Sequence, residues 1–194
     1  MKKIIAFIVA VCLAASSFAD DYLRSTAGFE MVDQQGEIHK FEEYKSVDYL
    51  VMFVNGVGCP ISRISTIDYL TLSEHFAGEN IQFLMFNSNI QDSPERIAKE
   101  VAEFKIPFPV LKDTNQAFAI ELGVERTADV FVIDTETGQV VYRGPVNDKL
   151  GYETQRTSVT HEYLMDALHV ILAGGIVNMD NIPESKGCLV GIFN

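Results

Sequence analysis

The feature that most constrains the fold is a cysteine placed where a buried strand gives way to a helix. The run from Tyr49 to Asn55 is strongly apolar without alternation, which predicts a strand buried on both faces. A glycine-containing turn follows, and the segment from Pro60 onward has helical periodicity. Cys59 is therefore expected at a helix N-terminus, where unpaired N–H groups and the helix dipole favour a reactive thiolate. A buried structural cysteine is the alternative.

The first residues have the pattern of a signal peptide. Two lysines precede a short apolar core, and a small-x-small cleavage pattern ends at Ala19. We therefore expect export to a periplasmic or secreted location, with residues 1–19 removed, 20–175 forming one domain and 176–194 forming a C-terminal tail. The apolar core is too short for an ordinary membrane span, so no stable membrane anchor is expected. An uncleaved N-terminal anchor is the alternative.

The charge and histidine content exclude several classes of partner. The net charge is −12, whereas proteins that bind nucleic acid need a surplus of lysine and arginine. The four histidines are scattered and match no metal-ligand spacing. We expect no nucleic acid, no metal and no other cofactor.

Two cysteines remain after removal of the signal peptide, which contains Cys12. An exported compartment permits a disulfide between Cys59 and Cys188. Their spacing leaves three possibilities open: a structural bridge, an attacking and a resolving thiol, or unpaired and intermolecular thiols.

Strands alternate with helices along the rest of the chain. Strands are expected at 28–32, 37–40, 49–55 and 81–86 and on both sides of a turn at 135–138, and helices at 60–76, 94–104 (with Ser93 as its N-cap), 117–122 and 160–174. The helix after Cys59 is expected to bury an apolar face made of Ile64, Ile67, Leu70, Leu72 and Phe76. This order predicts an α/β fold with a central mixed sheet covered by helices on both faces.

Three segments carry a resemblance to a known family: "FVNGVGCP", "FPVLKDTNQAFAIELGV" and "RTADVFVIDTETGQVVYRG". The layout resembles the thioredoxin fold in its redoxin form, the branch that contains peroxiredoxins and thiol-specific antioxidant proteins. The resemblance covers about Gly28 to Gly174. It implies a thioredoxin-like three-layer sandwich with Cys59 in the place of the nucleophilic or peroxidatic cysteine.

Four positions depart from the patterns of this family. Ser62, in "CPIS", replaces the second thioredoxin cysteine, and Gly56 replaces the peroxide-binding Thr or Ser of a peroxiredoxin. Asn55 replaces the first cysteine of the copper-delivery branch, so a thiolate pair for copper is missing. Ala128 replaces the family's cis-proline, and we expect a trans bond there because a non-proline cis bond costs about 2.5–4 kcal/mol.

The resemblance also suggests roles for other residues. Any resolving thiol must come from Cys188 or from another molecule. Redoxins can place a positive charge near the sulfur in the loop that contains Arg126, where a guanidinium would stabilise the thiolate and bind a peroxide or sulfenate oxygen. A solvated surface arginine is the alternative. Arg63, one turn into the Cys59 helix, is a second and weaker candidate, with a surface or ion-pair role as its alternative.

These observations predict an exported thiol redox protein. The Cys59 thiolate attacks a disulfide or a peroxide, Cys188 condenses with the product, and an external dithiol reduces the resulting bridge. A non-catalytic thioredoxin-fold module, in which Cys59–Cys188 is a structural disulfide, is the main alternative. A monothiol metal carrier is the third.

Overall fold

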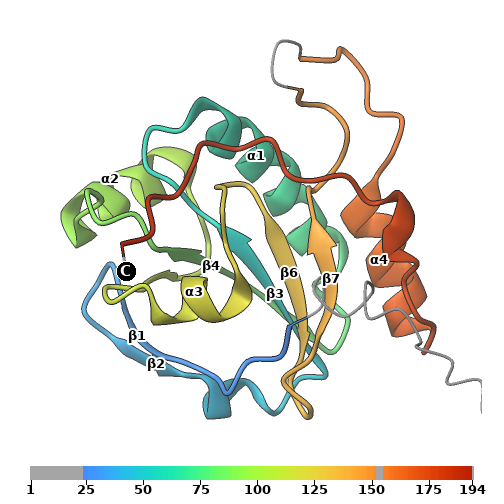
Figure 1. The fold of residues 1–194 in the computed structure, drawn as a ribbon, viewed down its shortest axis with the longest axis horizontal. Helices are drawn as coiled ribbons and strands as arrows, with labels where there is room; N and C mark the ends of the chain where they lie inside the picture. The colour runs from blue at the N-terminus through green and yellow to red at the C-terminus, as the bar shows by residue number, and fades with distance from the viewer. Residues whose placement is uncertain (1–23, 152–154, 194) are drawn as a thin grey trace, which may run out of the picture.

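A seven-stranded mixed sheet forms the centre of the molecule. The computed structural model describes residues 24–151 and 155–193. The strand order is β2-β1-β5-β4-β3-β6-β7 (Figure 1). The strands are β1 (Glu30–Asp33), β2 (Ile38–Lys40), β3 (Tyr49–Val54), β4 (Ile81–Asn87), β5 (Val110–Lys112), β6 (Val130–Asp134) and β7 (Val140–Gly144). Strand β3 runs parallel to β4 and antiparallel to β6, so the strand that leads to Cys59 is central.

Helices cover both faces of this sheet. The helices are α1 (Pro60–His75), α2 (Pro94–Phe104), α3 (Ala117–Leu122) and α4 (Tyr163–Leu172), with short 3-10 helices at η1 (Phe41–Tyr44) and η2 (Met179–Asn181). Val51 and Phe53 of β3 pack into a core with α1, α2 and α4, whereas Leu50 and Met52 pack into a second core with α3 and η1. The predicted α/β fold, a thioredoxin-like three-layer sandwich, is confirmed.

The predicted apolar face of α1 is partly wrong. Leu72 and Phe76 are buried, but Ile67 is 56% exposed, and the buried side of the helix carries Ser62, Thr66 and Tyr69 instead. The Tyr69 hydroxyl lies 2.8 Å from the carbonyl oxygens of both Val51 and Leu84. Thr66 donates to the Ser62 carbonyl within the helix. Because the Thr66 and Tyr69 hydroxyls find carbonyl partners inside the protein, these two polar residues can occupy the face on which the sequence pattern predicts aliphatic ones.

The remaining predicted elements lie where the sequence places them. Ser93 caps α2 by accepting the Arg96 amide, and Gly123, with φ +64°, ends α3.

The predicted signal peptide, with Cys12, lies outside the described residues. Within the described part of the chain, none of the helices is long and apolar enough to cross a membrane. The same residues contain no group of three or more His, Cys, Asp or Glu side chains that could hold a metal ion.

The C-terminal segment turns back over the domain after α4. It leaves α4 at Gly174, passes η2 and runs across one end of β7 and β6 toward α1 (Figure 1). Leu189 forms an isolated antiparallel bridge with Arg126, in the loop that precedes β6. The position that carries Cys188 is thereby brought to the end of the sheet where α1 begins.

Replacement of Tyr69 by phenylalanine tests the polar contact in the α1 core. The variant keeps the ring but loses the buried hydroxyl, so we expect the free energy of unfolding to fall by about 1–2 kcal/mol. Tyr49→Phe, at a partly exposed ring, is the matched control and is expected to change it by less than about 0.5 kcal/mol. Urea denaturation measures both, and a Tyr69→Phe protein as stable as the parent would contradict this account.

Candidate active site

Cys59 is the N-cap residue of α1. Its backbone is extended (φ −69°, ψ 117°), it follows Gly58 at φ +80°, and Pro60 occupies the first turn of the helix. The amide of Cys59 donates to the Gly56 carbonyl at 3.1 Å, which closes a tight turn at the end of β3. The local order of strand, turn, cysteine, proline and helix is therefore the one that the sequence predicts, and the side chain of Cys59 projects at the positive end of the helix dipole.

The tail pairs with the loop before β6 in the manner of an added strand. The Thr127 amide donates to the Cys188 carbonyl at 2.9 Å, and the Val190 amide donates to the Glu125 carbonyl at 2.9 Å. The side chain of Val190 is buried in the core on the α3 side of the sheet. Backbone hydrogen bonds and apolar burial thus both hold the tail in place.

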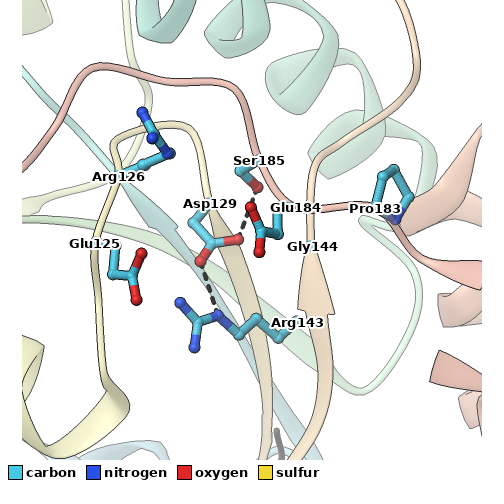
Figure 2. Close-up of a pocket in the computed structure, with 8 residues that line it drawn as sticks. All are labelled: Glu125, Arg126, Asp129, Arg143, Gly144, Pro183, Glu184 and Ser185. Carbon is cyan, nitrogen blue, oxygen red and sulfur yellow. Dashed lines mark hydrogen bonds and ion pairs between the residues drawn. The ribbon is translucent and has the colours of Figure 1, made fainter. Parts of the chain in front are cut away.

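A buried carboxylate anchors the tail a few residues earlier. Asp129 accepts a hydrogen bond from the Ser185 hydroxyl at 2.7 Å and one from Arg143 Nε at 2.9 Å (Figure 2). Burial raises the pKa of the Asp129 carboxyl, while the charge of Arg143 and the hydrogen bond from Ser185 oppose that rise. A cavity of about 90 Å³ lies beside this group, lined by Glu125, Arg126, Asp129, Arg143, Gly144, Pro183, Glu184 and Ser185.

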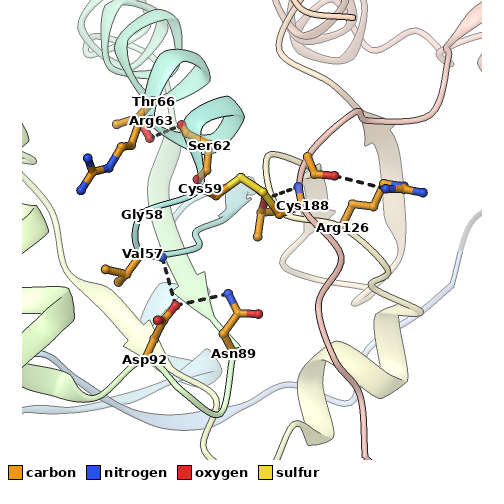
Figure 3. The surroundings of a disulfide bond; sticks show 12 residues. Val57, Gly58, Cys59, Ser62, Arg63, Thr66, Asn89, Asp92, Arg126 and Cys188 are labelled. Atoms are coloured by element: carbon orange, nitrogen blue, oxygen red, sulfur yellow. Dashed lines mark hydrogen bonds between the residues drawn. A yellow bond between two sulfur atoms is a disulfide. The ribbon is translucent and has the colours of Figure 1, made fainter. Parts of the chain in front are cut away.

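A disulfide joins Cys59 to Cys188 across this contact (Figure 3). The two Cα atoms are 6.2 Å apart, within the range that a disulfide requires. The two sulfur-bearing residues differ in accessibility, because Cys59 is only 6% exposed whereas Cys188 is an exposed residue. An external thiol can therefore reach the bridge most directly at Cys188.

Thr127 contacts both halves of the bridge, a role that the sequence analysis missed. Its hydroxyl donates to Cys59 Sγ at 3.2 Å and accepts the Cys188 amide at 3.0 Å. The next residue, Ala128, has φ +60°, a left-handed conformation that costs about 1–2 kcal/mol for a residue with a Cβ. No cis peptide bond occurs in the described residues, in line with the trans bond expected at Ala128. The signal available in the sequence was the position of Thr127 directly before the family's missing proline.

The two arginines proposed from the sequence make contacts with the protein itself. Arg126 Nη1 donates to the Gly187 carbonyl at 3.2 Å, and its guanidinium extends along the tail away from the disulfide (Figure 3). Arg63 donates to Glu100 Oε2 from both Nε and Nη2, at 3.1 and 3.0 Å. Arg63 thus takes the ion-pair role that was its alternative, and Arg126 keeps its anion-binding role as a prediction.

Gly187→Ala tests whether close docking of the tail holds the two cysteines together. A Cβ at Gly187 would overlap the backbone carbonyl of Thr127, so the tail must shift. Forced overlap of this kind costs about 1–3 kcal/mol, which would lower the equilibrium constant for forming the disulfide by about fivefold to 150-fold. Mass spectrometry of trapped thiols in defined glutathione buffers gives the oxidised fraction.

Gly191→Ala is the matched control in the same tail. A Cβ there would meet the Phe193 ring at 3.5 Å, an ordinary van der Waals contact, so we expect the parent oxidised fraction. Equal oxidised fractions for Gly187→Ala and Gly191→Ala would show that docking does not control pairing.

Several solved structures share this fold. A hypothetical protein of Sinorhizobium meliloti is 26% identical, with a TM-score of 0.75 over 86% of this chain and 92% of its own. An uncharacterized conserved protein of Geobacillus kaustophilus is 24% identical, with a TM-score of 0.70 over 88% of this chain and 91% of its own. Peroxidoxin BcpB of Mycobacterium tuberculosis is 20% identical, with a TM-score of 0.58 over 77% of this chain and 94% of its own.

The sequence also matches a protein family. No curated protein matches it. A family model described as Redoxin matches residues 16–160, a span that contains Cys59, Thr127 and all seven strands of the sheet but ends before Cys188. Because this match covers most of the sequence, and the structure has the thioredoxin-like fold, the chain belongs to the Redoxin family.

Proposed function

We propose that this protein is a thiol redox enzyme that cycles between the Cys59–Cys188 disulfide and two thiols. The observation that carries the proposal is the position of the bridge, which joins the N-cap of α1 to an exposed cysteine on a docked tail. A disulfide at a helix N-terminus is poised for exchange, because the dipole there favours the thiolate released when the bridge opens.

Reduction begins at the accessible sulfur. A thiolate of an external dithiol attacks Cys188 Sγ, the S–S bond breaks, and Cys59 leaves as a thiolate. The helix N-terminus and the Thr127 hydroxyl stabilise this leaving group. Ser62, in the first turn of α1, has a buried hydroxyl with no hydrogen-bond partner among the described residues, so a further donor is available to the thiolate. The second thiol of the reductant then releases Cys188 and leaves as a disulfide.

Oxidation begins at Cys59. With a hydroperoxide, the thiolate takes the terminal oxygen, the O–O bond breaks, and the leaving alkoxide or hydroxide takes a proton to give an alcohol or water. The Cys188 thiol then attacks the sulfenic sulfur, which restores the bridge and releases water. With a disulfide substrate, Cys59 forms a mixed disulfide that Cys188 resolves, releasing the reduced substrate. Neither route needs a prosthetic group.

The docked tail supports rapid closure of the bridge. The hydrogen bonds of Thr127, Glu125 and Asp129 to the tail do not depend on the sulfur atoms. Cys188 therefore stays beside Cys59 after reduction, and the second step is intramolecular with a high effective concentration.

For Arg126 to bind a substrate oxygen, its guanidinium must exchange the Gly187 carbonyl for that oxygen.

The comparisons at the level of the fold support thiol chemistry, but they do not indicate whether the substrate is a peroxide or a disulfide. Structural neighbours include Peroxidoxin BcpB and a thiol-disulfide oxidoreductase of Bacteroides fragilis. We further propose, from the signal-peptide pattern, that the protein acts in an exported, disulfide-permissive compartment with an external dithiol as its reductant.

A non-catalytic module is the second candidate. The low exposure of Cys59 and the firm docking of the tail favour a bridge that is only structural. The two candidates differ in one respect that can be measured, namely whether the disulfide is repeatedly reduced and re-formed while substrate is consumed.

Cys59→Ser tests the proposal directly. With a dithiol present, we expect the parent protein to consume hydroperoxide or a model disulfide repeatedly, and Cys59→Ser to fall to the uncatalysed background.

Cys188→Ser is the informative partner, because it keeps the nucleophile but loses the resolving thiol. Without added thiol, it should react once and stop as a sulfenic acid or mixed disulfide, visible by mass spectrometry. Background rates for the parent with both substrates would favour the non-catalytic module.

A further inference from the structure

Two buried carboxylates hold the turn that precedes Cys59. The Val57 amide donates to Asp92 Oδ2 at 3.0 Å (Figure 3), and the Gly58 amide donates to Glu100 Oε2 at 2.9 Å. Asp92 is 1% exposed and Glu100 is 5% exposed. The two backbone amides immediately before the cysteine are therefore fixed by side chains that lie more than thirty residues further along the chain.

Glu100 also holds the helix that follows the cysteine. Its Oε2 atom accepts two hydrogen bonds from Arg63, and Oε1 accepts the Asn55 side-chain amide at 3.3 Å. The Arg63 amide donates to the Cys59 carbonyl at 3.0 Å, so the backbone of Arg63 lies one helical turn after Cys59, while its guanidinium points away from the disulfide (Figure 3). One carboxylate on α2 thus contacts the residue before Cys59 and the turn of α1 after it.

The charges around this turn are arranged in pairs. Arg63 offsets Glu100, with Glu103 3.8 Å from the same guanidinium, and Arg96 lies 3.0 Å from Asp92. The Lys112 ammonium donates to the Asn89 carbonyl, and the Asn89 side-chain amide donates to Asp92. The described contacts of Arg126 lie on the opposite side, along the tail. The pair nearest to Cys59 in the chain is Arg63 with Glu100.

We propose that Glu100 is a positioning residue for the Cys59 redox couple, and that it acts by fixing the Gly58 amide and by balancing the charge of Arg63 in the first turn of α1, the helix whose N-terminus holds Cys59. This inference rests on the proposed function, since it concerns the state in which the bridge is open. It goes beyond that function by assigning control of the thiolate to a residue of α2 that does not contact the sulfur.

The proposal makes opposite predictions for the two members of the pair. Buried and half-buried charges are weakly screened, so each acts at a distance on a thiolate formed at the N-cap of α1. Glu100→Gln leaves the Arg63 charge with only the more exposed Glu103 carboxylate near it, and should favour the thiolate. Arg63→Gln leaves the Glu100 carboxylate unbalanced and should disfavour it. A loosened turn without an electrostatic component would move both variants in the same direction.

The test is the pH dependence of Cys59 alkylation in the fully reduced protein. Peptide mass spectrometry follows Cys59 separately from Cys12 and Cys188. Below the midpoint of the parent profile, we expect alkylation of Cys59 to be roughly threefold faster in Glu100→Gln and roughly threefold slower in Arg63→Gln. The double variant should return toward the parent rate. Arg63→Lys keeps the charge and should stay close to the parent.

Two controls keep the outcomes distinct. Glu95→Gln makes the same change at an exposed position on α2 and should leave the profile unchanged. Should Glu100→Gln fail to fold, Arg63→Gln and Arg63→Lys still test the proposal. Arg63 is partly exposed, so we expect its variants to fold. Shifts in the same direction, or none in folded variants, would overturn the proposal. Alkylation needs no turnover, so a protein without enzymatic activity can still show opposite shifts, which separates failure of this inference from failure of the proposed function.

Discussion

Backbone pairing between the tail and the loop before β6 is the contact on which the candidate site depends. The exchange of hydrogen bonds between Thr127 and Cys188 places the second cysteine over the N-cap of α1. That approach is close enough to require a residue without a side chain at Gly187. Without this pairing, two cysteines that are 129 residues apart in the chain would meet only at the entropic cost of closing a long loop.

Buried charged groups support this contact from two sides. Asp129 lies beneath the tail and binds Ser185, while Glu100 lies behind the turn and binds Gly58. Buried carboxylates are costly unless they are paired and hydrogen-bonded, and each of these has an arginine partner. Loss of one partner therefore affects both local stability and the geometry around the sulfur atoms.

Local signals allowed much of the fold and half of the site to be predicted. The apolar run before Cys59 and the proline after it fixed the strand, the turn and the helix start, because each depends on adjacent residues. The pairing with Cys188 stayed open, since the path of the tail depends on long-range contacts with Thr127 and Asp129. The prediction of the buried face of α1 was partly wrong. Thr66 and Tyr69 are buried with their hydroxyls bonded to carbonyl groups, and a search for apolar periodicity does not detect buried residues of this kind.

The central claim is that the Cys59–Cys188 bridge is a cycling couple rather than a fixed link. Its reduction potential tests this most directly, and it can be measured by trapping thiols in glutathione or dithiothreitol buffers of known potential. We expect a value of roughly −270 mV or higher, the range in which catalytic dithiol couples lie. A value below about −300 mV, which is typical of structural disulfides, would contradict it.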